Sequence, residues 1–118
     1  MKTPFLATLF SVLLATAALA GDVTIAEAKK LVSAGDVVIV DVRTPEEFAA
    51  GHIKGAKSIN VLSKDFEEKV AKLDPKKPVL VHCKMGGRSA KALATFKKLK
   101  FEKVYHMKEG YDAWTAVE

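Results

Sequence analysis

The sequence contains a single cysteine among its 118 residues. One thiol cannot form an internal disulfide, so the folded chain must be stabilised by its core and not by covalent cross-links. It also cannot supply a Cys-x-x-Cys pair, so a thiol redox protein built on it would need a resolving thiol from outside the chain. A lone thiol is either an inert core residue or a reactive group, and the residues around Cys83 favour the second.

Other features are scarce as well. Aromatic residues are not interleaved with the basic ones, which argues against nucleic-acid binding. Lys and Arg number 19 against 14 Asp and Glu, and this mild excess, a net charge of +5, suits a small anionic substrate. No internal repeat or low-complexity linker is visible, and the length fits one domain.

The N-terminal stretch differs from the rest of the chain. Lys2 precedes an almost entirely apolar run, residues 5–19, and small residues up to Ala20 fit a signal-peptidase site. We interpret residues 1–20 as a signal peptide and residues 21–118 as the mature domain, which would be periplasmic or secreted. Because a membrane span needs about 20 apolar residues, we expect no stable membrane association after cleavage. An uncleaved N-terminal anchor is the alternative.

Short β-branched runs alternate with amphipathic stretches in the remainder of the chain. Hydroxyl caps at Thr24, Thr44 and Ser63 predict helix starts, and glycines end the first two helices. The pattern predicts strands at 37–40, 56–61, 79–82 and 104–107, and helices at 24–35, 44–51, from 63, from 88 and at 111–117. The helical pattern after Gly86-Gly87 has its apolar positions at Ala90, Leu93, Ala94 and Leu99. Such alternation predicts an α/β three-layer fold, with a mainly parallel sheet and helices on both faces.

The cysteine stands at the edge of this sheet where ligands are expected. Cys83 follows the strand 79–82 and precedes a helix that begins near Arg88, and ligands bind beyond the carboxyl ends of parallel strands. The two glycines between them allow a tight turn, and a curled loop before a helix N-terminus directs several N–H groups at one anion. Those groups and the helix dipole should lower the pKa of Cys83. Lys84 and Arg88 add positive charge at the rim, so the sequence predicts an activated thiolate.

Three segments of the chain resemble the rhodanese-like sulfurtransferases. The first is residues 41–56, the second is the loop 83–89, and the third is residues 109–114, in which Glu109 stands where the family often has glycine. Together they span nearly all of the chain after residue 20. The resemblance implies a rhodanese-like domain over residues 21–118.

The resemblance also implies roles for individual residues. It makes Cys83 the residue that becomes a persulfide, and Arg88 the second catalytic residue. The loop N–H groups would hold the bound anion or the outer sulfur, which gives the substrate-binding residues as Lys84, Met85, Gly86, Gly87 and Ser89. The residues Asp41, Arg43 and His52 are expected to pair with one another and support the loops around the site. No metal or cofactor is implied.

For most other conspicuous side chains we expect structural roles. His82 should point away from Cys83, because successive strand residues face opposite sides of a sheet, and it is expected to be packed and not to act as a general base. Tyr111 and Trp114 are expected in the core. The residues alone assign no role to His106.

The length of the loop distinguishes the expected sulfur transfer from the phosphate chemistry of phosphatases with a similar loop. Four residues lie between Cys83 and Arg88, one fewer than in the phosphatase relatives, and the shorter ring fits one sulfur atom. The loop also has no carboxylate to protonate an ester leaving group. We therefore expect a monomeric thiosulfate sulfurtransferase that moves sulfur from a small anionic donor to cyanide or a thiol, and Lys84 favours dianionic thiosulfate as that donor. A carrier of a partner's persulfide sulfur and a thiol redox protein remain alternatives.

Overall fold

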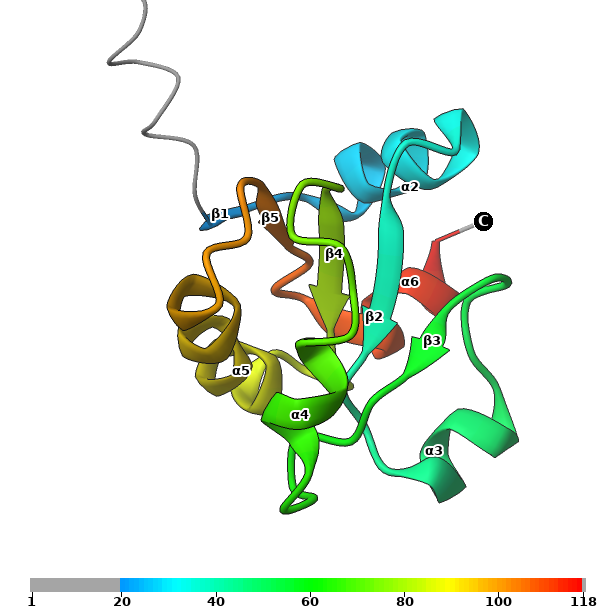
Figure 1. The fold of residues 1–118 in the computed structure, drawn as a ribbon. Helices are drawn as coiled ribbons and strands as arrows, with labels where there is room; N and C mark the ends of the chain where they lie inside the picture. The colour runs from blue at the N-terminus through cyan, green and yellow to red at the C-terminus, as the bar shows by residue number, and fades with distance from the viewer. Residues whose placement is uncertain (1–19, 118) are drawn as a thin grey trace, which may run out of the picture.

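A five-stranded sheet forms the centre of the protein (Figure 1). The computed structural model describes residues 20–117, so the predicted signal peptide lies outside the described residues apart from Ala20. All neighbouring strands are parallel, in the order β1-β5-β4-β2-β3. The strands are β1 Ala20–Asp22, β2 Val38–Asp41, β3 Lys57–Ser58, β4 Val79–His82 and β5 Val104–His106.

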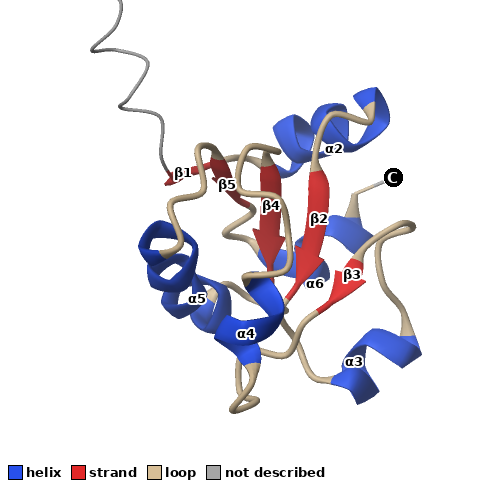
Figure 2. Cartoon of the chain, in the orientation of Figure 1, coloured by secondary structure: helices blue, strands red, loops and turns tan. Residues whose placement is uncertain are grey.

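Helices cover both faces of this sheet, as Figure 2 shows. On one face lie α4 Phe66–Val70 and α5 Gly87–Lys98, and on the other lie α2 Ile25–Ala34 and α6 Gly110–Ala116. The short helix α3 Pro45–Ala50 follows the carboxyl end of β2. The predicted three-layer α/β arrangement is confirmed. Within residues 20–117, none of the helices combines the length and the apolar character needed to cross a membrane.

The central strand β4 is buried on both faces, which explains its continuous apolar sequence. Val79 and Val81 pack into the core beneath α4 and α5, together with Phe96. Leu80 points the other way, into the core shared with α2 and α6, where it joins Met107. Every residue of β4 is buried, so this strand holds the segment that follows it in a fixed position.

Capping residues set the helix boundaries that the sequence predicts. Thr24 and Glu27 form a reciprocal capping box at the start of α2, with hydrogen bonds of 2.8 and 3.1 Å between the side chain of each and the backbone N–H of the other. Gly35 ends α2 with φ at +73°. Thr44 and Glu47 repeat the same box at α3, and this second box fixes where the Glu47 carboxylate lies.

Several predicted elements differ from the structure. The edge strand β1 is absent from the sequence prediction, because Ala-Gly-Asp has no strand pattern and pairing with β5 alone defines it. The strand predicted at 56–61 shortens to β3, since only Lys57 and Ser58 pair with β2. Ser63 does not cap a helix; its hydroxyl bonds Asp65, and α4 begins at Phe66. The buried face of α5 is Ser89, Ala92 and Phe96. Of the apolar positions in the predicted pattern, Leu93 and Leu99 are partly buried and pack against the core, whereas Ala90 and Ala94 are exposed.

Candidate active site

Cys83 lies directly after β4 and before the N-terminus of α5, as the sequence predicts. Cys83 is only 1% exposed, so its sulfur lies at the base of the loop and not on the protein surface. The Gly86 N–H donates to Cys83 Sγ at 3.0 Å, and the Ser89 hydroxyl lies 3.3 Å from the same sulfur. Both donors point at the position where a thiolate charge would develop.

These donors decide the ionisation of the thiol. Burial raises the pKa of Cys83, but hydrogen bonds from the Ser89 hydroxyl and from the backbone N–H groups of Ser89, Gly86 and Met85 outweigh it. The net pKa of Cys83 therefore lies below its ordinary value. The thiolate form of Cys83 is thus favoured mainly by uncharged donors and by the positive end of α5.

The loop is held from behind by the segment that leads into α6. The Tyr111 N–H donates to the Cys83 carbonyl at 2.8 Å, and the Asp112 N–H donates to the Lys84 carbonyl at 3.2 Å. This contact needs a glycine, because a Cβ on Gly110 would stand 2.2 Å from the Lys84 carbonyl oxygen and φ there is +80°. A Cβ on Gly86, where φ is +104°, would likewise stand 2.3 Å from the Lys108 carbonyl oxygen.

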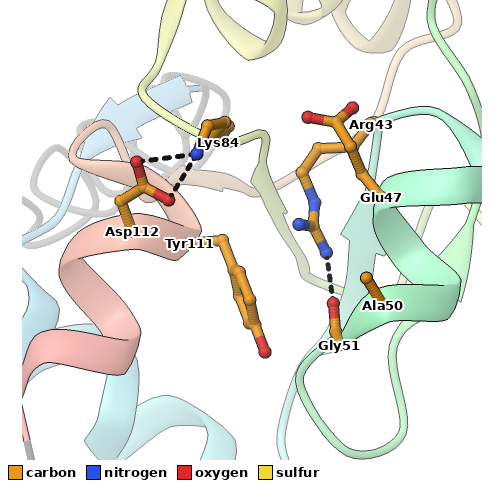
Figure 3. A pocket seen from close by; sticks show the side chains of 7 residues that line it. All are labelled: Arg43, Glu47, Ala50, Gly51, Lys84, Tyr111 and Asp112. Atoms are coloured by element: carbon orange, nitrogen blue, oxygen red, sulfur yellow. Dashed lines mark hydrogen bonds and ion pairs between the residues drawn. The ribbon is translucent and has the colours of Figure 1, made fainter.

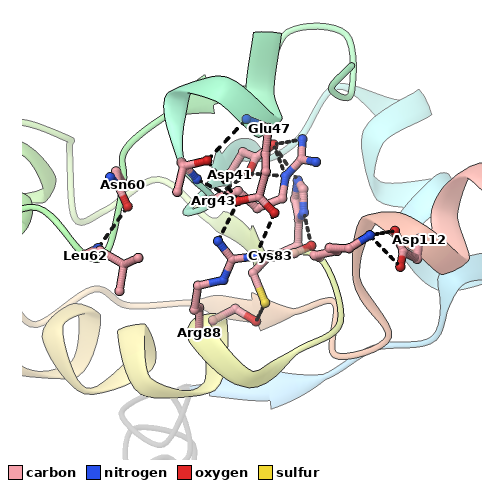
Figure 4. Close-up of polar contacts among 12 residues, drawn as sticks. Asp41, Arg43, Glu47, Asn60, Leu62, Cys83, Arg88 and Asp112 are labelled. Atoms are coloured by element: carbon pink, nitrogen blue, oxygen red, sulfur yellow. Dashed lines mark hydrogen bonds and ion pairs between the residues drawn. The ribbon is translucent and has the colours of Figure 1, made fainter. Parts of the chain in front are cut away.

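Arg88 does not stand free at the rim. Its guanidinium makes two hydrogen bonds, of 2.6 and 2.9 Å, to the Glu47 carboxylate of α3 (Figure 4). The pair lowers the pKa of Glu47 to about 2. The sequence prediction placed positive charge here without a partner, and it missed Glu47 because only the spatial arrangement brings α3 opposite α5.

Lys84 is paired in the same way on the other side of the loop. Its ammonium lies 3.0 and 3.1 Å from the two oxygens of Asp112, and both side chains are about half exposed. A pocket of about 300 Å³ opens beside this pair (Figure 3). It is lined by Arg43, Glu47, Ala50, Gly51, Lys84, Tyr111 and Asp112. Acidic and basic side chains thus line a pocket beside Lys84, the residue that follows Cys83.

The predicted support residues are brought together only in part. Asp41 and Arg43 form a buried pair with an N–O distance of 2.7 Å, and Arg43 also donates to the Gly51 carbonyl at 2.8 Å. The hydrogen bond to Asp41 raises the pKa of Arg43. His52 does not join this pair: it is exposed, stacks on Phe48 at 3.7 Å and has Nδ1 2.8 Å from the Phe48 carbonyl.

His82 is buried on the face of β4 opposite the α5 side. Its Nδ1 lies 3.0 Å from the Cys83 carbonyl, so Nδ1 carries the proton and donates. Burial lowers the pKa of His82, which keeps the ring neutral. The expectation of a packed histidine without a role as base agrees with this placement. Tyr111 packs against His82 and, unlike the prediction for it, also lines the pocket, while Trp114 is partly buried and packs against the core.

The remaining loop residues have distinct positions. Met85 is 72% exposed and contributes its backbone N–H, Gly87 begins α5, and Ser89 is fully buried with its hydroxyl beside the sulfur. Ser89 Oγ also lies 2.8 Å from Nε2 of His106, whose Nδ1 lies 3.1 Å from Asp22 of β1. No sequence pattern signals this last contact, because it depends on β1 pairing with β5. Residues 20–117 contain no cluster of His, Cys, Asp and Glu suited to a metal ion.

Comparison with known proteins identifies similar chains. A family profile described as rhodanese-like domain matches residues 24–117. The chain is 31% identical over 101 residues to thiosulfate sulfurtransferase GlpE of Pseudoalteromonas translucida, covering 80% of this chain and 88% of that protein. It is 35% identical over 104 residues to thiosulfate sulfurtransferase 18 of Arabidopsis thaliana, covering 78% and 76%. It is 38% identical over 78 residues to a probable adenylyltransferase/sulfurtransferase, MoeZ, of Mycobacterium tuberculosis, with 66% of this chain but 20% of that protein covered.

Solved structures give the same result for the fold. The human single-domain sulfurtransferase TSTD1 matches with a TM-score of 0.71 and 25% identity, covering 82% of this chain and 96% of that one. A rhodanese-like domain protein from Staphylococcus aureus matches with a TM-score of 0.70 and 29% identity, covering 79% and 89%.

Proposed function

This chain belongs to the rhodanese-like, single-domain sulfurtransferase family, and on that premise we propose that it transfers sulfur from thiosulfate to cyanide or a thiol through a persulfide on Cys83. The observation that carries the proposal is the sulfur of Cys83, held by the Gly86 N–H and the Ser89 hydroxyl at the N-terminus of α5. The lowered pKa of that thiol increases the fraction present as the thiolate nucleophile.

In the first half-reaction the Cys83 thiolate attacks the outer sulfur of thiosulfate. A new S–S bond forms, the bond between the two sulfur atoms of the donor breaks, and sulfite leaves with the electron pair. The product is a persulfide anion on Cys83. The loop N–H groups and the Ser89 hydroxyl, which hold the thiolate in the free protein, are suited to stabilise that anion as well.

In the second half-reaction the acceptor attacks the outer sulfur of the persulfide. Cyanide forms a C–S bond, the S–S bond breaks, and thiocyanate leaves while the electron pair returns to Cys83 as thiolate. The cycle is a two-step exchange that consumes no oxidant or reductant. Its kinetic signature is ping-pong behaviour.

The basic side chains at the rim of the loop bear on how tightly an anionic donor binds. Arg88 and Lys84 both lie beside the loop, but each is engaged by a carboxylate, Glu47 and Asp112 respectively. A donor dianion gains from either cation only to the extent that it competes with that carboxylate. We expect this competition to set the KM for thiosulfate while leaving the chemistry to the uncharged donors around Cys83.

The direct test is the thiosulfate:cyanide assay on residues 21–118, beside the Cys83→Ser variant. We expect complete loss of thiocyanate formation in the variant, because serine cannot form a persulfide. Since the chain has one cysteine, mass spectrometry after thiosulfate treatment reports on Cys83 without ambiguity. A gain of one sulfur atom, reversed by cyanide, is expected for the unmodified chain. Turnover that survives in the variant would disprove the proposal.

A persulfide carrier is the second candidate, and one feature favours it. Met85, in the loop that follows the nucleophile, is 72% exposed, so its side chain is accessible to a protein that would deliver or receive sulfur. Such a carrier would accept sulfur from a loaded protein and turn over thiosulfate slowly. Mass spectrometry separates the three outcomes: sulfur gained from thiosulfate supports the enzyme, sulfur gained only from a persulfide-bearing protein supports the carrier, and a mixed disulfide alone supports thiol redox chemistry.

We further propose that the protein is exported and acts as a monomer. The apolar segment before Gly21 and the small residues at its end support cleavage after Ala20. N-terminal sequencing of the protein recovered from expressing cells tests the site, and an intact Met1 would refute it. Sedimentation of residues 21–118 tests the monomer.

A further inference from the structure

A continuous line of polar contacts leads from the nucleophile to the sheet edge. Cys83 Sγ lies 3.3 Å from Ser89 Oγ, Ser89 Oγ lies 2.8 Å from His106 Nε2, and His106 Nδ1 lies 3.1 Å from an Asp22 oxygen. The side chains come from the loop after β4, from α5, from β5 and from β1. Ser89 is fully buried and the His106 side chain is 4% exposed, whereas Asp22 is 61% exposed.

Counting protons shows how these contacts depend on one another. An ionised Asp22 accepts only, so the proton between it and His106 belongs to Nδ1. In a neutral imidazole Nε2 then has no proton and accepts the single proton of the Ser89 hydroxyl. Ser89 cannot at the same time donate to Cys83. When Nε2 is protonated it donates to Ser89 Oγ, and the Ser89 proton is then available to the sulfur at 3.3 Å or to the Gly86 carbonyl oxygen at 3.2 Å.

We propose that Ser89 and His106 form a proton relay that ionises Cys83, with Asp22 holding the charged imidazole in place. The Cys83 thiol proton moves to Ser89 Oγ as the Ser89 hydroxyl proton moves to His106 Nε2. The S–H bond breaks and an N–H bond forms, so a thiol and a neutral imidazole become a thiolate and an imidazolium, with the serine unchanged. His106 acts through Ser89 and is a positioning residue for the nucleophile.

The surroundings of His106 are compatible with this role. Asp22 from β1 is the charged group in contact with the ring, Ser89 from α5 separates the ring from the thiol, and β4 pairs with His106 through Val81, which has no titratable side chain. Lys108 contacts the His106 carbonyl through its backbone N–H. The relay therefore has one acid, one base and one acidic support among the described residues.

The test follows the rate of Cys83 alkylation by iodoacetamide against pH, which needs neither a sulfur donor nor an acceptor. It can therefore fail while sulfur transfer holds, or hold while sulfur transfer fails. In Ser89→Ala the thiol loses both the hydrogen bond and the relay, so its titration should move to higher pH. His106→Gln keeps an amide donor for Ser89 but no base, and we expect its titration to move in the same direction, with alkylation at neutral pH lowered about tenfold per pKa unit.

Two further variants make the result specific. Asp22→Asn removes the charge that holds the imidazolium, and a smaller shift in the same direction is expected. His52→Gln makes the same chemical change at an exposed histidine outside the relay, and its alkylation profile should match that of the unmodified chain. Circular dichroism establishes that each variant is folded. A folded His106→Gln protein with an unchanged profile overturns the relay, since an amide would then serve as well as an imidazole.

Discussion

At the scale of single residues, the nucleophile depends on neutral donors more than on the basic side chains beside it. Gly86 N–H and the Ser89 hydroxyl contact the sulfur directly, whereas Arg88 and Lys84 contact carboxylates. Neutral donors of this kind are suited to stabilise both the thiolate and the persulfide. The basic residues are thus better placed to influence donor binding than the ionisation of Cys83.

For the Lys84–Asp112 pair we predict opposite changes in the KM for thiosulfate when one or the other partner is replaced. Lys84→Ala should raise the KM for thiosulfate, because a cation beside the loop is lost. Asp112→Asn should lower that KM by up to about fivefold, because exposed ion pairs are worth about 0.2–1 kcal/mol and the ammonium is released to the dianion. Steady-state kinetics at low ionic strength measures both. An unchanged KM in both variants would show that this cation does not meet the donor.

Gly110 permits the close contact between the loop and the start of α6. Gly110→Ala should destabilise the fold by about 2–4 kcal/mol and reduce sulfur transfer, because the methyl group overlaps the Lys84 carbonyl and the residue has positive φ. Gly55→Ala is the matched control, since Gly55 has φ +87° but no heavy atom within 4 Å of the added Cβ. Urea unfolding and the assay are measured for both. Equal losses would mean that backbone strain alone, and not the loop contact, sets the cost.

At the scale of elements, the Arg88–Glu47 pair joins α5 to α3 across the entrance of the site. Glu47 has two functions in one position: it closes the capping box with Thr44 and it accepts two hydrogen bonds from Arg88. Because the capping box already orients the Glu47 carboxylate, little further side-chain freedom is lost when Glu47 pairs with Arg88. This ion pair connects residues 41–56, which include α3, to the start of α5.

The ion pair predicts a specific dependence of stability on acid. The pKa of Glu47 falls from 4.5 to about 2 on folding, so its contribution is complete above pH 4.5 and is lost as the pH falls toward 2. Glu47→Gln keeps a capping side chain but removes the charge. We expect its free energy of unfolding in urea to decline less between neutral pH and about pH 3 than that of the unmodified chain. Glu46→Gln, an exposed neighbour on α3, is the control; a Glu47 variant that declines as steeply as this control would contradict the prediction.

Local signals in the sequence were sufficient for most elements. The capping boxes at Thr24 and Thr44, the glycine at position 35 and the continuous apolar run of β4 each specify structure through neighbouring residues. The position of Cys83 and the character of its loop followed from the same signals. Partners from distant segments could not be predicted, because Glu47, Asp112 and Asp22 meet the site only through the order of strands in the sheet.

At the scale of the whole molecule, the site draws on every layer of the fold. The sheet order puts β4 at the centre, β5 and β1 on one side and β2 on the other, so the loop after β4 is reached from both sides. The family profile begins at residue 24 and therefore omits β1, although Asp22 of β1 contacts His106. A domain boundary drawn from the family match alone would remove this contact.

Two shortened chains test the contribution of β1. A chain of residues 21–118 keeps Asp22, whereas a chain of residues 24–118 loses the strand that pairs with β5. We expect the shorter chain to be less stable by about 2 kcal/mol, because ladder hydrogen bonds contribute about 1 kcal/mol each. Urea unfolding of both chains measures the difference. Equal stability would mean that β1 adds nothing to the sheet.

The docking of Tyr111 and Asp112 behind the loop has a consequence for protein synthesis. Translation delivers Cys83 before the segment from Gly110 onward, and until that segment docks the loop lacks the hydrogen bonds from the Tyr111 and Asp112 N–H groups. We expect the thiol of a chain at that stage to have a pKa nearer its ordinary value and to be less reactive. The order of synthesis would then delay modification of the thiol until folding is complete.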